Sequence, residues 1–316
     1  EAEDVKVKGY RKPLSDLGKG DIPKGAKFVE IAVKNISDKY PLKTGLRITT
    51  KSDFSSQFGF GSSSASTVCT IKGVSEILGL RLTNKEIFNL SYKTVLDIQG
   101  KGSGFDIAAA VYGGTLYFVT GGKVIEPLNI SDLPLIVGYT GIKADTVTLV
   151  NQVRETFANK QDRLNAIYNS IEALVNRAKD AASKKDWKTL GELMNKNQEY
   201  LGELGVSIPI LDTMIKGAVD AGAYGAKLSG AGGGDCMIAI AANDKKETVK
   251  KLEPYIIEVN GKGSGGMYDL DKHLKALKKS GMQIDVSLIG RSSRDLVNIL
   301  IEEGIKYKNK LLTPSV

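Results

Sequence analysis

Apolar residues recur at intervals of three and four along several parts of the chain, which is the spacing of one face of an α-helix. This pattern predicts helices over 27–35 and 64–80 and a mostly helical region over 147–220. The apolar positions are Phe28, Ile31, Ala32 and Val33 in the first segment, Val68, Ile71, Val74, Ile77 and Leu78 in the second, and Leu164, Ile167, Ile171, Leu174 and Ala178 in the third. Each helix has one face suited to burial in a core.

Helix start signals support two further predictions. Thr83 followed by Glu86 is a capping box, in which each side chain accepts a hydrogen bond from the other residue's backbone N–H. It predicts a helix that runs to about Ile98. Asp145 and Thr146 follow an apolar segment and mark the start of another helix.

Short runs of apolar and β-branched residues predict strands at 45–50, 115–119, 132–140 and 236–241. The first fifty residues combine short β-prone pieces with one helix. The pattern changes from mixed α/β to helix-rich near residue 150. We therefore predict an N-terminal lobe over 1–149 and a C-terminal lobe over 150–262.

Three segments rich in small residues lie beside predicted elements, at 59–67, 99–106 and 226–235. The first leads into a predicted helix, where unpaired backbone N–H groups and the helix dipole favour an anion. The alternative is a loop of glycine and serine that only caps this helix. The segment matches neither the P-loop pattern nor G-x-G-x-x-G. Three such segments in one chain indicate an enzyme that handles phosphate groups.

Composition narrows the function classes. With 316 residues, 41% hydrophobic and 25% charged, the chain is typical of globular proteins. It has no secretory signal pattern and no apolar run near the roughly 20 residues that span a bilayer. The net charge is +8, but the lysines are scattered and no aromatic recognition motif accompanies them. This favours a polyanionic small molecule such as ATP over nucleic acid.

Cysteine and histidine usage excludes further classes. Cys69 and Cys236 are far apart, which argues against a disulfide scaffold and fits a reducing cytoplasm. His273 is the single histidine, so a histidine-based metal site or catalytic triad is not expected. The chain begins with Glu1 rather than Met, and we expect that the natural start lies further upstream.

The C-terminal segment over 263–316 is predicted to be a linker and an α-β-α appendage. The linker at 263–266 consists of glycine and serine. It is followed by a predicted helix at 270–279, a strand at 283–289 and a helix at 293–307. Because Met267 comes directly after the linker, a join between two reading frames is one interpretation.

The motifs resemble the superfamily of galactokinase, homoserine kinase, mevalonate kinase and phosphomevalonate kinase, and within it the mevalonate kinases most. The resemblance covers about residues 1–260. It rests on 59–65, similar to the family's phosphate loop, and on 102–106 with 112–114, similar to the segment of the catalytic aspartate. It rests also on 138–141 with 145–146, on 204–212, and on 227–236, which is similar to the family's third motif.

The resemblance implies an α+β fold of two lobes, the small-molecule kinase fold, with the appendage added. It implies transfer of the ATP γ-phosphate to the 5-hydroxyl of mevalonate with Mg²⁺, in isoprenoid biosynthesis, without nucleic acid or membrane partners. Whether the chain forms a homodimer is left open. The implied site residues are Asp106 for catalysis, Ser63 (or Ser62) for the metal, Gly59, Gly61, Ser62, Ser63, Ser64, Gly230, Gly232 and Gly233 for the nucleotide, and Thr140, Thr146 and Ala231 for the substrate.

Several of these side chains have simpler interpretations. Asp106 follows a Gly-rich turn, so it can be a helix cap. Lys101 and Lys143 either contact phosphates or lie in solvent. Lys227 either anchors the fold or faces the substrate. Asp235 stands where the family often has glycine, and a turn residue is the simple interpretation.

Three departures from the family pattern affect the expected activity. Residues 1–50 do not match the family's opening motif. Val95 stands where a metal-binding glutamate is expected, and Asp97 lies about 200° further round the helix. Phe58 is bulky beside a phosphate loop. We therefore expect weak activity unless the missing motif is supplied. A kinase with another acceptor (phosphomevalonate, homoserine or a sugar) and a nucleotide-binding relative without turnover are the alternatives.

Overall fold

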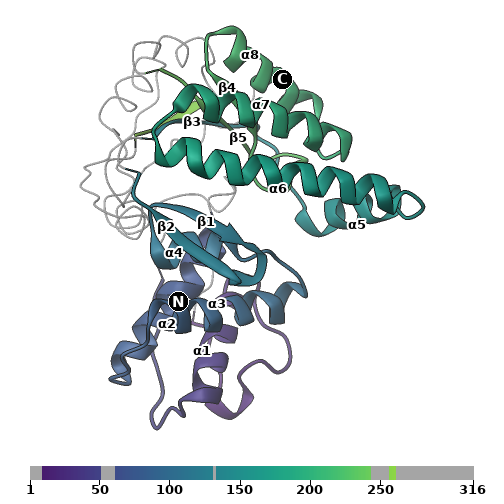
Figure 1. Cartoon of the computed structure of the whole chain (residues 1–316). Helices are drawn as coiled ribbons and strands as arrows, with labels where there is room; N and C mark the ends of the chain where they lie inside the picture. Colours follow the sequence, from purple (N-terminus) through teal and green to yellow (C-terminus); the bar gives the residue numbers. More distant parts are fainter. Residues whose placement is uncertain (1–8, 51–60, 131–132, 243–255, 261–316) are drawn as a thin grey trace, which may run out of the picture. The chain divides into compact units, whose positions relative to one another are not determined.

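The computed structural model describes residues 9–50, 61–130, 133–242 and 256–260, the last as backbone only. The described chain divides into two compact units, and each is described by itself (Figure 1). The first unit covers 9–50 and 61–127, and the second covers 128–130, 133–242 and 256–260. The lobe limits predicted above stay predictions, and the predicted appendage lies outside the described residues. In the part that is described, no helix combines the length and apolar character of a membrane span.

The first unit is built mainly from helices. Its α-helices are α1 (Lys27–Lys39), α2 (Ser62–Ile77), α3 (Asn84–Gln99) and α4 (Phe105–Tyr112), and a short 3₁₀ helix covers Leu14–Asp16. Strands β1 (Thr115–Val119) and β2 (Val124–Leu128) pair with each other and flank a 3₁₀ turn at Thr120–Gly122. Helices α1, α2 and α3 pack against one another, and α4 packs on α2 and α3. The centre of this core consists of Ala32, Ile36, Ile71, Phe88, Ile107 and Ala108, all fully buried.

The local signals in this unit correspond to the observed elements. The helices predicted at 27–35 and 64–80 are confirmed as α1 and α2, and the strand at 115–119 is confirmed as β1. The capping box of α3 makes both of its hydrogen bonds: Glu86 N donates to Thr83 Oγ1 (3.3 Å), and Thr83 N donates to Glu86 Oε2 (2.9 Å).

The strand predicted over 45–50 is wrong. Residues 45–49 form no strand, and only Thr50 makes an isolated bridge. Leu46 and Ile48 are partly buried against the core of the first unit. Their apolar character therefore serves packing on this core, since strand propensity alone does not decide whether a segment becomes a strand.

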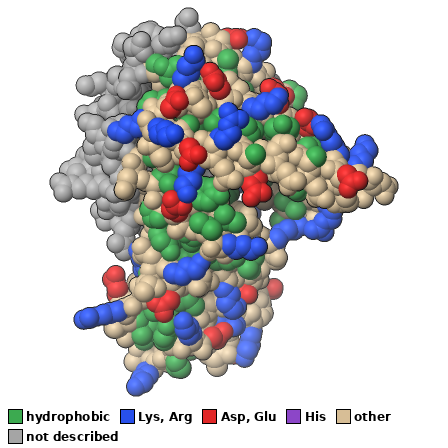
Figure 2. All heavy atoms as spheres, viewed as in Figure 1, with side chains coloured by type: hydrophobic (Ala, Val, Ile, Leu, Met, Phe, Trp, Pro, Cys, Tyr) green, Lys and Arg blue, Asp and Glu red, His purple; other side chains and the backbone are tan. Residues whose placement is uncertain are grey.

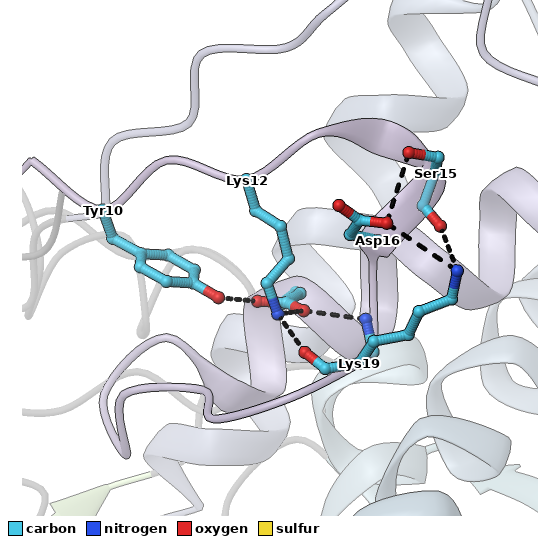
Figure 3. Close-up of polar contacts among 7 residues, drawn as sticks. Tyr10, Lys12, Ser15, Asp16 and Lys19 are labelled. Atoms are coloured by element: carbon cyan, nitrogen blue, oxygen red, sulfur yellow. Dashed lines mark hydrogen bonds and ion pairs between the residues drawn. The ribbon is translucent and has the colours of Figure 1, made fainter.

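The buried carboxylate of Glu30 in α1 binds the N-terminal segment through hydrogen bonds (Figure 3). Glu30 lies in α1 and accepts hydrogen bonds from Tyr10 Oη (2.5 Å), Lys12 Nζ (2.8 Å) and Gly18 N (2.7 Å). Lys12 also donates to the carbonyl oxygen of Lys19 (2.6 Å). Burial by itself would raise the pKa of Glu30, but the bonds from Lys12, Tyr10 and Gly18 outweigh it and hold the pKa below its usual range. Glu30 is therefore stabilised as an anion inside the unit.

The second unit contains a four-stranded antiparallel sheet in the order β4-β5-β3-β6. The strands are β3 (Pro134–Tyr139), β4 (Gly225–Leu228), β5 (Cys236–Ile240) and β6 (Ile256–Asn260). Its helices are α5 (Thr146–Thr156), α6 (Gln161–Ser183), α7 (Trp187–Glu203) and α8 (Pro209–Asp220). Helices α7 and α8 pack on β4 and β5, and α6 packs on α7. The core between sheet and helices includes Ile136, Ile167, Leu211, Ala226, Leu228, Met237 and Ala239.

Helix α7 lies in backbone contact with β4 because both elements carry glycine there. A Cβ atom at Gly225 would lie 1.8 Å from the carbonyl oxygen of Gly191. Beside this contact, Asn195 Nδ2 donates to Tyr224 O (3.2 Å), and Ala226 N donates to Asn195 Oδ1 (2.9 Å). Since β4 is an edge strand of the sheet, the side chain of Asn195 satisfies backbone groups that no strand pairs.

The predictions for this unit are largely confirmed. The strands at 132–140 and 236–241 correspond to β3 and β5, and the region 147–220 is mostly helical. Leu164, Ile167 and Leu174 face the cores of this unit, as their spacing predicts. Strands β4 and β6 were not predicted.

Candidate functional site

The N-terminus of α2 has the properties of an anion site. The helix begins after Gly61, which has a left-handed backbone (φ 73°) and makes no side-chain cap. The N–H groups of the first helical turn have no helical partner, and the helix dipole makes this end positive. Backbone N–H groups and positive potential together favour phosphate. Gly59 and Phe58, also named above, lie outside the described residues.

The three serines in this first turn differ in what their hydroxyl groups do. Ser62 and Ser63 are half-buried, and neither hydroxyl has a hydrogen-bond partner among the described residues. Ser64 is buried, with 1% of its surface exposed, and its hydroxyl donates to Asp106 Oδ2. The hydroxyls of Ser62 and Ser63 are therefore open to a ligand, whereas that of Ser64 is engaged.

Asp106 lies at the N-terminus of a second helix, α4. The cap position of α4 is Gly104 (φ 86°), and Asp106 is the second helical residue, so it is not the cap residue itself. Its Oδ1 accepts from Ile107 N (3.0 Å), and its Oδ2 accepts from Ser64. A Cβ atom built on Gly61 would lie 3.7 Å from Asp106 Cβ. The starts of α2 and α4 are therefore neighbours within the first unit, with the carboxylate between them.

The Gly-rich segment before α4 is held by the aromatic ring of Tyr92. Tyr92 Oη donates to Gly102 O (2.7 Å). A Cβ atom built on Gly104 would lie only 2.8 Å from Cδ2 of the Tyr92 ring. Gly121 N donates to Ser103 O (2.9 Å) on the other side of the segment. Lys101 is half-buried in this segment. These contacts fix the backbone that leads into Asp106.

Of the described residues, neither Val95 nor Asp97 supplies a second carboxylate beside Asp106. Val95 is buried in the core and lies 3.5 Å from a Cβ atom built on Gly102. Asp97 accepts from Lys93 Nζ (2.6 Å) and Asn35 Nδ2 (2.8 Å). Burial would raise the pKa of Asp97, but these two donors outweigh it and lower the pKa. Within the described ranges, no group of three or more His, Cys, Asp or Glu residues could hold a metal ion.

In the second unit, the third Gly-rich segment joins β4 to β5 and is held by close backbone packing. A Cβ atom at Gly232 would lie 2.2 Å from Val206 O, and one at Gly234 would lie 2.6 Å from Ile142 O. Gly233 N donates to Val206 O (2.8 Å). Gly230 is exposed with open space around its Cα, so it is the glycine of this loop with room for a ligand. Ala231 follows it and is half-buried.

Of the two threonines predicted to contact substrate, one is enclosed and one is exposed. Thr140 is buried; its Oγ1 donates to Asp235 O (2.9 Å) and accepts from Ile142 N (3.1 Å). Thr146 is exposed at the first position of α5, next to the helix cap Asp145. The hydroxyl of Thr140 therefore shapes the loop, and Thr146 is the more accessible of the two.

Lys143 and Asp235 form an ion pair, with Nζ 3.0 Å from Oδ1 and 3.3 Å from Oδ2. Asp235 has a left-handed backbone (φ 52°), and Ala144 N also donates to its Oδ1 (3.4 Å). Its own N–H donates to Ile142 O (2.7 Å). Asp235 thus connects the loop before α5 to the third Gly-rich segment, which a simple turn residue would not do.

Lys227 is a half-buried lysine in β4, two residues before that segment. Its Nζ donates to Leu228 O (2.5 Å), and no carboxylate of the described chain pairs with it. Burial lowers the pKa of Lys227 to about 8. The contact with Leu228 anchors the side chain.

The pairing of Ser64 with Asp106 and that of Lys143 with Asp235 were not predicted from the sequence. Both join residues far apart in the chain, by 42 and 92 positions. The third consecutive serine at the helix start was a visible signal for the first pair. No local signal in the sequence indicated the second pair.

Comparison with known proteins places two family profiles on the chain. The profile described as "GHMP kinases N terminal domain" matches residues 27–114, and "GHMP kinases C terminal" matches residues 170–255. The first match contains the starts of α2 and α4, and the second contains the third Gly-rich segment.

Individual relatives extend over most of the chain. A mevalonate kinase of Pyrococcus horikoshii is 36% identical over an alignment of 279 residues, and the match covers 83% of each protein. The crystal structure of Methanococcus jannaschii mevalonate kinase has a TM-score of 0.64 at 30% identity and covers 80% of each chain. The crystal structure of L. major mevalonate kinase in complex with R-mevalonate has a TM-score of 0.62 at 27% identity, covering 77% of this chain and 80% of the other.

Proposed function

The chain belongs to the GHMP kinase family as an ATP-dependent small-molecule kinase, and we propose that its acceptor is mevalonate, which it converts to 5-phosphomevalonate. The observation that carries the proposal is the meeting of two helix N-termini at one carboxylate. Asp106 lies between the starts of α2 and α4 and accepts a hydrogen bond from Ser64. Ser62 and Ser63 directly precede Ser64, and their hydroxyls make no hydrogen bond within the described residues. This combines an anion site with a group that can take or orient a proton.

Phosphoryl transfer depends mainly on positioning and on charge neutralisation, because the protein forms no covalent bond to the phosphorus. The backbone N–H groups at the start of α2 would bind phosphate oxygens of ATP, with Gly61 allowing close approach. The hydroxyls of Ser62 and Ser63 would add further donors. The positive end of the helix would stabilise the charge that develops on the transferred group.

Asp106 would act on the hydroxyl group of the acceptor. The hydroxyl oxygen forms a bond to the γ-phosphorus while the bond from that phosphorus to the β–γ bridging oxygen breaks, and ADP leaves with the electron pair. The hydroxyl proton passes to Asp106 or is oriented by it. Both oxygens of Asp106 already accept one hydrogen bond each, and each keeps a further lone pair for the acceptor.

Magnesium fits the oxygen donors that are present. Mg²⁺ in kinases is bound by one or two carboxylates together with substrate phosphates. Ser63 would hold it through its open hydroxyl, and the Asp106 carboxylate is the acidic group at this site. When bound with ATP, the ion would neutralise charge on the phosphates. Val95 and Asp97 would take no part, because one is apolar and the other is engaged by Lys93 and Asn35.

The second unit would supply contacts of the nucleotide and the acceptor. We assign these contacts to Gly230 and Ala231, in the exposed part of the third segment, and to Thr146 at the start of α5. Gly232 and Gly233 would support this loop through their packing on Val206 and Leu149. Thr140 would shape the acceptor side through its hydroxyl bonds.

We propose a reducing compartment for this protein and a small molecule as its partner. Neither cysteine forms a disulfide, which supports a reducing compartment such as the cytoplasm. On the face drawn in Figure 2, Lys and Arg side chains are interspersed with Asp and Glu, and this supports a small-molecule partner rather than nucleic acid. A homodimer stays a prediction.

A direct test is ATP-dependent phosphorylation of R-mevalonate, followed by ADP release and by product mass. We expect weak turnover with mevalonate, in line with the departures from the family pattern, and less with phosphomevalonate, homoserine or galactose. The Asp106→Asn variant serves as the control for background hydrolysis. Turnover of another acceptor in preference to mevalonate would overturn the assignment of substrate. ATP-analogue binding without turnover of any acceptor would overturn the assignment as a kinase.

A further inference from the structure

We propose that Ser64 is a positioning residue for Asp106 rather than a ligand of the nucleotide phosphates. Its hydroxyl would hold one carboxylate oxygen of Asp106 so that the carboxylate faces the acceptor hydroxyl in one orientation. This inference rests on the proposed kinase function, because it assigns Ser64 a role in the same reaction.

Ser64 is far more buried than the two serines that precede it in α2. Ser64 exposes 1% of its surface, whereas Ser62 and Ser63 are half-buried at the same helix start. The hydroxyl of Ser64 donates to Asp106 Oδ2, and this is its one hydrogen bond within the described chain. A hydroxyl enclosed in this way is not placed to bind a phosphate that arrives from solvent.

Other hydroxyl groups of α2 donate to backbone carbonyls of their own helix, whereas that of Ser64 does not. Ser66 and Thr67 donate to Ser62 O (2.9 Å) and Ser63 O (2.8 Å), as polar residues within helices commonly do. Ser75 likewise donates to Lys72 O (2.7 Å). Ser64 makes no such bond to a backbone carbonyl of the described residues. Its hydroxyl is therefore available to reach across to α4.

Two hydrogen bonds, one to each oxygen, fix the plane of the Asp106 carboxylate. Asp106 Oδ2 accepts from Ser64 on α2, and Oδ1 accepts from Ile107 N on α4 itself. The bond to Ile107 moves with α4, whereas the bond to Ser64 joins α4 to the phosphate-binding helix. Ser64 thus couples the position of the proton acceptor to the helix that binds ATP.

Removal of the Ser64 hydroxyl should therefore lower turnover and leave nucleotide binding almost unchanged. A misplacement of about 1 Å in a reacting group can cost about 100-fold in rate. We expect the Ser64→Ala variant to lose about 10- to 100-fold in kcat, with the KM for ATP within about twofold of the wild type. The Ser64→Thr variant keeps a hydroxyl, and we expect it to retain more of kcat than Ser64→Ala.

The matched control is Ser75→Ala. Ser75 is a buried serine of the same helix, with 4% exposed, and its hydroxyl bonds only to a backbone carbonyl. Its removal should leave kcat and both KM values unchanged. Thermal unfolding of all three variants identifies any loss of kcat that comes from misfolding.

Two outcomes would overturn the proposal. One is a Ser64→Ala variant with normal kcat and a raised KM for ATP, which is the behaviour of a phosphate ligand. The other is a variant with unchanged kinetics altogether. If the wild type phosphorylates none of the tested acceptors, the proposed function fails instead.

Crystal structures of the wild type and of Ser64→Ala test the positioning without any activity measurement. We expect Ser64 Oγ within hydrogen-bond distance of Asp106 in the wild type and a rotated carboxylate in the variant. A wild-type carboxylate out of reach of Ser64, or one unmoved by the substitution, would overturn the proposal.

Discussion

Replacing Gly191 with alanine tests the contact that holds the edge strand of the second unit. The methyl group would lie 2.5 Å from the carbonyl carbon and the Cβ of Tyr224 and 2.7 Å from Gly225 N. Ordinary contacts of carbon atoms lie near 3.5 to 4 Å. Most of these neighbours are backbone atoms, so they cannot turn aside as the end of a flexible side chain would. Helix α7 and strand β4 must therefore separate by about 1 Å.

The expected change in the free energy of unfolding combines one stabilising and two destabilising contributions. Alanine in a helix interior is favoured over glycine by about 0.5–1 kcal/mol. Overpacking of a closed contact costs about 1–3 kcal/mol. The separation would also strain the bonds of Asn195 to Tyr224 and Ala226, each worth about 1 kcal/mol. We expect a net loss of about 2 kcal/mol, which corresponds to a Tm lower by about 4–8 °C.

The assay is thermal and denaturant unfolding followed by circular dichroism, with Gly202→Ala as the matched control. Gly202 lies in the same helix, and nothing lies within 4 Å of the position of its Cβ atom. Alanine there should leave stability unchanged or raise it by as much as about 1 kcal/mol. If Gly191→Ala is as stable as Gly202→Ala, the backbone contact between α7 and β4 is refuted. Because β4 leads into the third Gly-rich segment, the destabilised variant should also bind substrates less tightly.

Three further predictions concern catalysis, pH dependence and thiol reactivity. Asp106→Asn should lower kcat by about 10²–10⁴-fold while an ATP analogue still binds, as checked by calorimetry, and normal turnover would exclude Asp106 as the group that acts on the acceptor. Glu30→Gln should destabilise the first unit at pH 7 by about 2 kcal/mol, because three hydrogen bonds to a charged carboxylate are weakened. The folded-state pKa of Glu30 is lowered, so its stabilisation is present above the unfolded pKa and is lost as pH falls through the folded pKa. The difference between wild type and Glu30→Gln in urea unfolding should therefore shrink from pH 7 toward pH 3, and a constant difference would contradict the assignment. Burial and the charge of Asp235 raise the pKa of Cys236 to about 12, so a thiol reagent at pH 8 should label only the exposed Cys69 until the protein unfolds. Labelling of both thiols at equal rates in the folded protein would disprove this burial.

The elements predicted correctly are those whose signals are local. Helix α1 follows from the spacing of its apolar face, and the start of α3 follows from Thr83 and Glu86, which interact across a single turn. The Gly-rich segments and their order were also sufficient to indicate the family, because glycine at a helix start has a physical purpose that is readable in sequence.

The elements missed are those that depend on a partner. The segment 45–50 has strand-like composition but forms no strand, and its apolar side chains pack on the core of the first unit, whereas the short strand β4 forms because β5 lies beside it and α7 satisfies its outer edge. Composition does not report which segment will be a neighbour.

The amino-acid sequence was sufficient to predict the positions of most helices, and it led us to propose a phosphate site at the start of α2 and Asp106 as the candidate catalytic group. The contact of Ser64 with Asp106 and the ion pair of Lys143 with Asp235 became visible only in the folded structure. The physical reason is the separation along the chain over which each kind of interaction acts. Capping and periodicity act over a few residues, but a hydrogen bond between side chains far apart in the chain exists only after packing has brought their helices or loops together.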